Sequence, residues 1–228
     1  MEEKFVFKTE LHAHVNPVSR CSDIAPEELA DIYIAKGYDA VVVTNHFIKG
    51  FTTPEAFLES YEQSRLAGKR AGIEMLLGME IRFVKEGEND YLVYGLTEED
   101  VFRAWDYLDG TLEDFYRGFK REDILIIQAH PFRSTSTPRG EDVLDGIEVF
   151  NLHPNHNSRV GLAAAYAARH PAWITTGGTD FHHHGHEAMC AMLTRTALKQ
   201  SKEVVAALKT KEYRLLVGNH VIMPFEGK

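Results

Sequence analysis

The chain has 228 residues, with 25 Lys and Arg against 34 Asp and Glu, so its formal net charge is −9 before its 12 histidines are counted. A protein that binds along a nucleic-acid polymer needs a basic face, so this balance disfavours such a partner but permits a small phosphate ester in a local pocket. The length and the 44% apolar content suit one domain over residues 1–228 with a substantial core.

The chain carries no readable signal for membrane insertion or export. Its longest aliphatic stretch, residues 124–127, is far shorter than the roughly 20 apolar residues that span a bilayer. Residues 1–4 do not begin a basic segment followed by a long apolar one. Cys21 and Cys190 do not make a disulfide framework and are expected to be reduced thiols. We therefore expect a cytoplasmic protein without a membrane partner.

Strand-like and helix-like segments alternate along the chain. Short β-branched runs separated by amphipathic segments are typical of βα units around a largely parallel sheet or barrel, so the predicted class is α/β. The acid-rich residues 85–90 are expected to form a solvated turn. The predicted strands are residues 5–11, 39–44, 75–83, 91–96, 124–129, 146–150 and 173–176, and the predicted helices are residues 25–37, 54–68, 98–107, 112–119, 160–169 and 201–209.

Histidines and carboxylates follow the predicted strands, where parallel α/β folds gather their active sites. His12 and His14 follow the first strand two residues apart, so their side chains point the same way and can reach one ion. Asp180 and His182 have the same spacing after a later strand, behind two glycines that permit a close backbone approach. The alternative for His12 and His14 is two incidental polar residues at a strand end.

Three further candidates lie at or near strand ends. His46 ends the second predicted strand, and His130 ends another, with Pro131 behind it to stop the ladder. Glu80 lies inside an apolar run, where an unpaired carboxylate is costly to bury and seeks a cation or a proton. The alternative for Glu80 is an outward-facing residue of an exposed strand.

Imidazole or carboxylate groups recur at five separate predicted strands, and this pattern predicts a metal centre. These ligands, without a thiolate, suit zinc, manganese or iron, and Glu80 could bridge two ions, so we expect two or three divalent cations. Clustered cations convert a bound water to hydroxide near neutral pH and neutralise the attacking and leaving oxygens. Phosphoester hydrolysis requires this chemistry.

Together these motifs resemble those of the PHP (polymerase and histidinol phosphatase) superfamily. The resemblance covers about residues 8–190 and implies a distorted (βα)7 TIM-like barrel, up to three metals at the C-terminal ends of its strands, and phosphoester hydrolysis. The motifs that carry it are His12-Ala13-His14, Thr44-Asn45-His46, Glu80, Ala129-His130-Pro131 and Thr179-Asp180-Phe181-His182.

The resemblance also implies how the ligands divide among the ions. One ion would be held by His12, His14, Glu80 and Asp180, a second by Glu80 and His130, and a third by His46 and His182.

Three positions depart from the superfamily pattern. A further His or Asp ligand usually lies about six residues after the second histidine, where this chain has Arg20, whose guanidinium offers only donors. Asp23 or Cys21 could replace it after a small register shift. The histidine usual between the Glu and His-Pro motifs is missing, and Asp90 could replace it. Asn45 stands where Asp is usual, which removes a charge beside the ligands.

Arginines in loops near the predicted ligands are candidates to bind the substrate phosphate. Arg20, Arg133 and Arg159 could each grip it in a bidentate fork. His153 or His156 could supply a ligand or donate a proton to the leaving alkoxide, and we favour His156. The alternative for each is an ordinary solvated loop residue. The candidate catalytic residues are Asp180, His156 and Arg20.

The predicted function is a metal-dependent phosphoesterase that uses a metal-activated hydroxide. We favour a phosphomonoesterase acting on a small phosphorylated metabolite of the histidinol-phosphate or nucleotide type. One alternative is an amidohydrolase, although those barrels usually carry a bridging Lys and Lys49 is the only Lys that ends a strand here. Another alternative is a non-catalytic metal-binding regulatory module.

Overall fold

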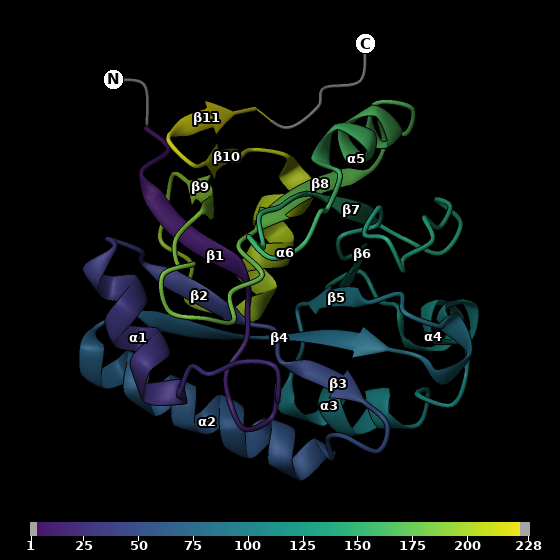
Figure 1. Cartoon of the computed structure of the whole chain (residues 1–228), viewed down its shortest axis with the longest axis horizontal. Coiled ribbons are helices and arrows are strands. Elements are labelled where there is room, and N and C mark those ends of the chain that lie inside the picture. Colours follow the sequence, from purple (N-terminus) through teal and green to yellow (C-terminus); the bar gives the residue numbers. More distant parts are fainter. Residues whose placement is uncertain (1–3, 224–228) are drawn as a thin grey trace.

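The computed structural model of the chain describes residues 4–223. The prediction that the first residues carry no export signal, and the two ends of the predicted domain 1–228, fall partly outside this range. Strands and helices alternate in it (Figure 1). The strands are β1 (Phe7–Ala13), β2 (Ala40–Val43), β3 (His46–Ile48), β4 (Glu74–Arg82), β5 (Tyr91–Tyr94), β6 (Leu125–Gln128), β7 (Gly146–Asn151), β8 (Ile174–Gly178), β9 (Cys190–Thr194), β10 (Arg214–Val217) and β11 (His220–Ile222). The helices are α1 (Pro26–Ala35), α2 (Pro54–Ala71), α3 (Glu98–Trp105), α4 (Leu112–Phe119), α5 (Val160–Ala167) and α6 (Ser201–Thr210), with a 3-10 turn at Val84–Glu86.

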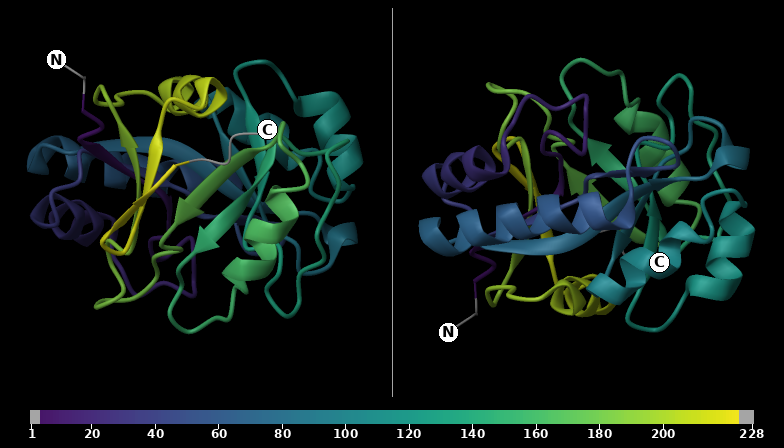
Figure 2. Two further views of the ribbon diagram at one scale, coloured as in Figure 1. Left: turned by 90° about the horizontal axis from the view of Figure 1, so that it is seen from above. Right: turned by 90° about the horizontal axis from the view of Figure 1, so that it is seen from below.

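The described strands form one curled, mixed sheet in the order β11-β10-β9-β1-β2-β4-β5-β6-β7-β8, with β3 paired to β4 (Figure 2). β1, β2 and β4 are parallel neighbours, and so are β6, β7 and β8. β5 is antiparallel to both β4 and β6, so the two parallel groups run in the same direction. The carboxyl ends of these strands therefore open on the same side of the sheet.

The predicted α/β class is confirmed, whereas a complete (βα)7 barrel is not. The sheet curls until the end of β8 comes beside β1, which it meets through one parallel bridge between Ala13 and Phe181. A continuous ladder cannot form there because the edge of β1 that faces away from β2 is paired with the antiparallel strand β9. The result is a half-barrel whose additional strands β9 to β11, beyond β1, the sequence analysis did not predict.

Local sequence explains where the main helices begin and end. The Thr53 side chain accepts a backbone N–H at the start of α2, Pro54 occupies its first turn, and Gly72 ends it with a φ of 85°. Thr97 and Thr111 start α3 and α4 with capping boxes. None of the helices in the described part of the chain is long and apolar enough to cross a membrane.

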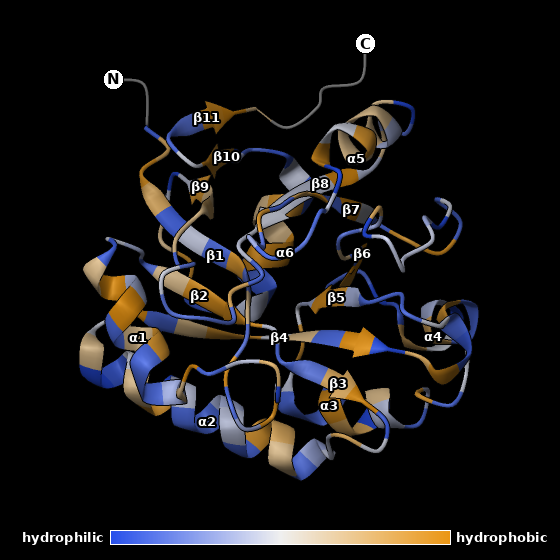
Figure 3. Ribbon diagram, in the orientation of Figure 1, coloured by the Kyte–Doolittle hydropathy of each residue, from blue (hydrophilic) through white to orange (hydrophobic). Residues whose placement is uncertain are grey.

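Apolar side chains are buried on both faces of the sheet. One group lies between the sheet and α2 to α5, and it includes Phe47, Phe115 and Trp173. Others lie under α6 and under α1, around Tyr213 and Tyr33. Figure 3 shows the matching pattern, with mostly apolar strands and helices that carry both polar and apolar stripes. The apolar layers cover the two faces of the sheet, so the polar side chains gather at the carboxyl ends of the strands.

Residues 85–90 connect β4 to β5 as the predicted turn, with Lys85, Gly87 and Glu88 exposed, but the turn is only partly solvated. Asn89 and Asp90 are buried. The Arg82 guanidinium donates two hydrogen bonds of 2.7 Å to the Asp90 carboxylate, and Arg139 donates to Glu86. Paired arginines thus compensate the burial of these acids.

Candidate metal centre

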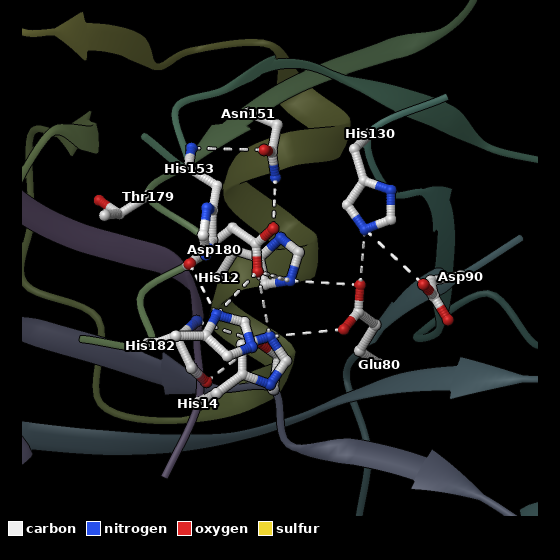
Figure 4. A network of polar contacts seen from close by, with 12 residues as sticks. His12, His14, Glu80, Asp90, His130, Asn151, His153, Thr179, Asp180 and His182 are labelled. Carbon is white, nitrogen blue, oxygen red and sulfur yellow. Dashed lines mark hydrogen bonds and ion pairs between the residues drawn. The ribbon is translucent and has the colours of Figure 1, made fainter. Parts of the chain in front are cut away.

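Glu80 lies at the centre of a buried cluster of imidazole and carboxylate groups (Figure 4). Its Oε1 is 3.4 Å from His12 Nε2 and 3.1 Å from His130 Nε2. Its Oε2 is 3.4 Å from His14 Nε2 and 2.8 Å from His46 Nδ1. Parallel pairing of β3 with β4 places His46 directly beside Glu80. Each oxygen of one carboxylate therefore faces two imidazole nitrogens from separate parts of the chain.

Asp180 faces the same imidazoles from the end of β8. Its Oδ1 is 3.4 Å from both His12 Nε2 and His14 Nε2. Its Oδ2 accepts hydrogen bonds from Arg133 Nη2 at 2.6 Å and from Asn151 Nδ2 at 3.1 Å. One oxygen of Asp180 is thus held by neighbouring donors while the other points into the cluster.

The backbone at the strand ends brings these groups close together. A Cβ on Gly178 would lie 2.4 Å from the His12 Cβ, so only glycine lets β8 approach β1 this closely. His130 and Asp180 both have left-handed backbone conformations, with φ of 30° and 55°. Such conformations cost energy in residues other than glycine and cluster at functional sites.

Glu148, on β7, supports the cluster from behind. Its Oε1 is 2.9 Å from His12 Nδ1, and its Oε2 accepts hydrogen bonds from the His130 backbone N–H and from Asn151 Nδ2. Because a carboxylate only accepts, His12 Nδ1 donates to Glu148, and Nε2, which faces Glu80 and Asp180, is the nitrogen that can bind a cation once it has lost its proton.

His14 is oriented in a similar way by Ser19. The Ser19 hydroxyl donates to Asn45 Oδ1 at 3.0 Å, so its oxygen accepts from His14 Nδ1 at 3.1 Å. The lone pair of His14 is therefore on Nε2. His182 Nδ1 donates to the Asp180 carbonyl at 2.9 Å, which leaves the His182 Nε2 lone pair free as well. Asn45 thus acts through hydrogen bonds, as its place beside the ligands predicts.

The donor atoms fit divalent cations. In the described part of the chain His12 Nε2 and His14 Nε2 are buried without a hydrogen-bond partner. Unpartnered buried polar atoms are costly, and here they converge. Metal–ligand distances of about 2.1 Å place tetrahedral ligand atoms about 3.4 Å apart, the separation found between His12, His14 and the two carboxylates.

The protonation states also suit metal binding. Burial opposes the ionisation of Glu80, but His12 and His46 outweigh it and hold the pKa of that carboxyl well below its usual range. Burial, with the neighbouring His182 and His46, lowers the pKa of His14, so its ring is neutral. Burial also opposes a charge on His12, yet Glu148 and Asp180 raise its pKa. A cation would therefore displace a proton from His12.

All seven predicted metal ligands lie in this cluster, although their individual roles stay predictions. Asp90 also comes within 4.8 Å of His46 and Glu80, but Arg82 already binds its carboxylate. The groups whose ligand atoms all lie within 4.8 Å of one another are His12 with His14 and Asp180, His46 with Glu80 and Asp90, and His14 with His46 and His182.

A cavity of about 220 Å³ opens beside the cluster, and only some of the predicted substrate-binding residues line it. Arg133 and His156 line it. Arg20 is exposed and lies over the Phe51 ring at 5.5 Å, and the exposed Arg159 donates to a backbone carbonyl. These two are not among the described residues that line the cavity, which are Cys21, His46, Glu80, Arg82, Asp90, Arg133, His153, Asn155, His156, Asp180, His182 and His183.

Sequence reasoning missed Glu148, Asn151 and Ser19, which hold the cluster in place. Glu148 had a usable signal, because it is a carboxylate inside an apolar strand, as Glu80 is. Asn151 and Ser19 carry no such signal, since their roles depend on partners far away in the chain.

No family model matches the sequence, and no curated protein matches it. Among solved structures, a two-domain protein of Bacteroides vulgatus, named as containing a predicted PHP-like metal-dependent phosphoesterase, superposes with a TM-score of 0.61 at 16% identity. The match covers 94% of this chain and 66% of that protein. The chain has a PHP-like fold.

Two further structures share this PHP-like fold at similar identity. A protein of Bifidobacterium adolescentis, provisionally named a metal-dependent phosphoesterase, matches with a TM-score of 0.51 at 15% identity, over 76% of this chain and 87% of that one. An amidohydrolase of Chromobacterium violaceum, with bound sulfate and no metal, matches with a TM-score of 0.52 at 16% identity, over 79% and 89%. The PHP-like fold thus accompanies more than one hydrolase name.

Proposed function

We propose that the chain is a metal-dependent phosphoesterase, and specifically a phosphomonoesterase acting on a small phosphorylated metabolite of the histidinol-phosphate or nucleotide type. The observation that carries this proposal is the convergence of unpartnered His12 and His14 Nε2 atoms with the Glu80 and Asp180 carboxylates, at separations of 3.4 Å. The names of two fold neighbours support the same reaction class.

The proposed ligands divide as the motif resemblance implies. Glu80 would hold two cations together, because its two oxygens face different histidines. When bound, divalent cations such as zinc, manganese or iron supply Lewis acidity and lower the pKa of water. The protein's part is to present ionised Glu80 and Asp180 beside imidazole Nε2 atoms, which His12 and His14 orient by donating from Nδ1 to Glu148 and Ser19.

The cavity favours a small, anionic substrate. Its volume of about 220 Å³ is below the ~300–1,000 Å³ of pockets that enclose drug-sized ligands, so the phosphoryl end fits inside and the alcohol part extends outward. Arg133 lies within the cavity, next to Asp180, where its guanidinium can bind a phosphoryl oxygen. His156, exposed at the cavity, is the proposed proton donor to the leaving alkoxide.

An amidohydrolase is the second candidate because one fold neighbour carries that name. Such sites usually bridge their metals with Lys, and the only candidate, Lys49, is half exposed and pairs with Asp109. Glu80 occupies the bridging place between the histidines instead. This arrangement favours phosphoester over amide hydrolysis.

A paired activity screen tests the proposal. The purified chain is incubated with added manganese or zinc and assayed for phosphate release from sugar, amino-alcohol and nucleotide phosphates, and in parallel for cleavage of simple amides. We expect phosphate release that Asp180→Ala abolishes while its circular dichroism spectrum stays native. Amide cleavage without phosphate release would support the amidohydrolase, and metal binding without any turnover would support a regulatory module.

A further inference from the structure

The two histidine–carboxylate motifs lie on opposite sides of the place where β1 meets the end of β8, which we call the seam. His12 and His14 belong to the β1 side, and Asp180 and His182 belong to the β8 side. Phe181 joins the two sides by two backbone hydrogen bonds, from its N–H to the His12 carbonyl at 3.1 Å and from the His14 N–H to its own carbonyl at 3.0 Å. The spacing of the proposed ligands therefore depends on what else holds the seam together.

Glu10 is buried at the seam and binds both of its sides. Its Oε1 accepts hydrogen bonds from the backbone N–H groups of His12 at 3.0 Å and Thr179 at 2.9 Å, and also from that of Leu11 at 3.0 Å. Its Oε2 accepts from the hydroxyl groups of Thr179 and Tyr33. A single carboxylate oxygen thus connects the backbones of the two sides.

The local structure of β1 explains why a side chain can take this place. The register of β1 against β2 shifts between Glu10 and Ala13. An irregularity of this kind interrupts the ladder, and backbone N–H groups beside it can bind a side chain instead. The Leu11 and His12 N–H groups lie within this irregular stretch and donate to Glu10.

A carboxylate in the core is costly to bury unless hydrogen bonds surround it. Glu10 accepts five, and two of their donors belong to Thr179. Glu10 is not among the described residues that line the cavity, nor among those that form the groups of possible metal ligands. It can therefore influence the cluster only through the backbone that carries the ligands.

We propose that Glu10 is a positioning residue that sets the distance between the two motifs by holding the His12 and Thr179 N–H groups on one oxygen. The inference rests on the proposed metal-dependent function and gives a role to a residue outside the motifs. Thr179 directly precedes Asp180, whose Oδ1 is 3.4 Å from His12 Nε2. A wider or narrower seam would change this separation, so the length of the Glu10 side chain matters more than its charge.

Two substitutions separate the length of the side chain from its charge. Glu10→Gln keeps the length and one acceptor oxygen, and its NH2 group faces hydroxyls that can accept as well as donate. Glu10→Asp keeps the charge but is one methylene group shorter. Tyr213→Phe is the matched control for lost stability, because it removes a buried hydrogen bond to the Thr175 carbonyl near the start of β8, away from the ligands.

The affinity of the metal-free chains for zinc is measured by competition with a chelator, the visible spectrum of bound cobalt(II) reports the arrangement of ligands, and thermal unfolding reports stability. Glu10→Gln and Tyr213→Phe should bind zinc within about threefold of wild type and keep the wild-type cobalt spectrum. Glu10→Asp should bind zinc about 10- to 100-fold more weakly, with an altered spectrum, as is typical when a residue that orients metal ligands is changed. Loss of stability alone would not produce this difference in folded chains.

A further measurement needs no variant and decides the question if Glu10→Asp does not fold. In the metal-free wild-type chain, the amide protons of His12 and Thr179 should exchange with deuterium as slowly as those of the central strands, as followed by nuclear magnetic resonance. Fast exchange at either amide would show that Glu10 does not hold it.

The results that would overturn the inference differ in what else they overturn. If wild type binds zinc and Glu10→Asp binds it equally well, or if Glu10→Gln loses as much affinity as Glu10→Asp, Glu10 does not set the distance, but the proposed metal centre stands. If the wild-type chain binds neither zinc nor cobalt, both proposals fail.

Discussion

Glu148 Oε1 lies 2.9 Å from His12 Nδ1, and both side chains are fully buried. The carboxylate fixes the ring so that His12 Nε2 points toward Glu80 and Asp180. The other oxygen of Glu148 holds the His130 backbone and the amide of Asn151. One residue thus positions several of the proposed ligands without facing the cavity.

Replacing Glu148 with Gln should weaken metal binding. The amide keeps the size of the side chain but places an NH2 group against neighbours that are themselves donors. Changes to such supporting residues typically cost about 10- to 100-fold in metal affinity, and we expect Glu148→Gln to fall in that range in a chelator competition assay. An affinity within about twofold of wild type would show that Glu148 does not orient the ligands.

Metal binding should release protons and weaken in acid. The pKa of His12 is raised because Glu148, Asp180 and Glu80 outweigh the effect of burial, so the metal-free ring holds a proton that a cation must displace. Affinity should therefore increase with pH until His12 loses its proton. Calorimetric titration of zinc in two buffers of different ionisation enthalpy measures the released protons. Equal heats in both buffers would argue against the assignment.

Arg133 and Arg159 should differ in their effect on substrate binding. Arg133 lines the cavity beside Asp180, whereas Arg159 is exposed and bonded to a backbone carbonyl. Arg133→Ala should raise KM for a phosphate ester by about 10- to 100-fold, the equivalent of the roughly 1.5–3 kcal/mol of a charged hydrogen bond. Arg159→Ala should leave KM near the wild-type value, and the opposite order would place the phosphate elsewhere.

Asp100 should contribute stability that depends on pH. Its buried carboxylate accepts two hydrogen bonds from Arg121 and caps α3 through Thr97. Burial opposes its charge, but Arg121 and Thr97 outweigh burial and lower its pKa. We expect Asp100→Asn to cost about 2 kcal/mol at pH 7, a stabilisation that is lost as the pH falls below the unfolded value of 3.8.

Urea unfolding of the Asp100→Asn and wild-type chains at pH 7 and pH 3 checks this prediction. The difference in the free energy of unfolding should shrink at the lower pH, and a constant difference would mean that the charge on Asp100 is not the cause. Because Asp100 lies at the start of α3, away from the cluster, this variant also controls for loss of stability in the Glu148→Gln experiment.

The positions of most strands and of the candidate ligands could be predicted from the sequence. The apolar run at residues 75–83 matches the observed strand β4 closely. Glu80 could be recognised because a carboxylate buried in an apolar strand needs a cation or a proton to compensate its charge. The strands β9 to β11 could not be predicted, because short runs after a histidine-rich loop look like loop sequence until it is known that β9 pairs with β1, β10 with β9 and β11 with β10.

The orientation of side chains beyond the strand ends could not be predicted either. Arg20 and Cys21 are adjacent in the chain, yet one points to solvent and the other into the cavity, because hydrogen bonds from Ser22 Oγ and the Asp23 N–H to the His182 carbonyl decide the direction of the loop. The Ser19 oxygen accepts a hydrogen bond from His14 because the Ser19 hydroxyl itself donates to Asn45, which is far away in the sequence. Such relationships depend on the assembled fold.

The metal content of the purified chain, measured by inductively coupled plasma mass spectrometry beside that of Asp180→Ala, tests the proposed centre most directly. The account predicts two or more divalent cations per wild-type chain and fewer in the variant, with both chains folded. A wild-type chain that remains metal-free after incubation with zinc, manganese and iron would contradict it.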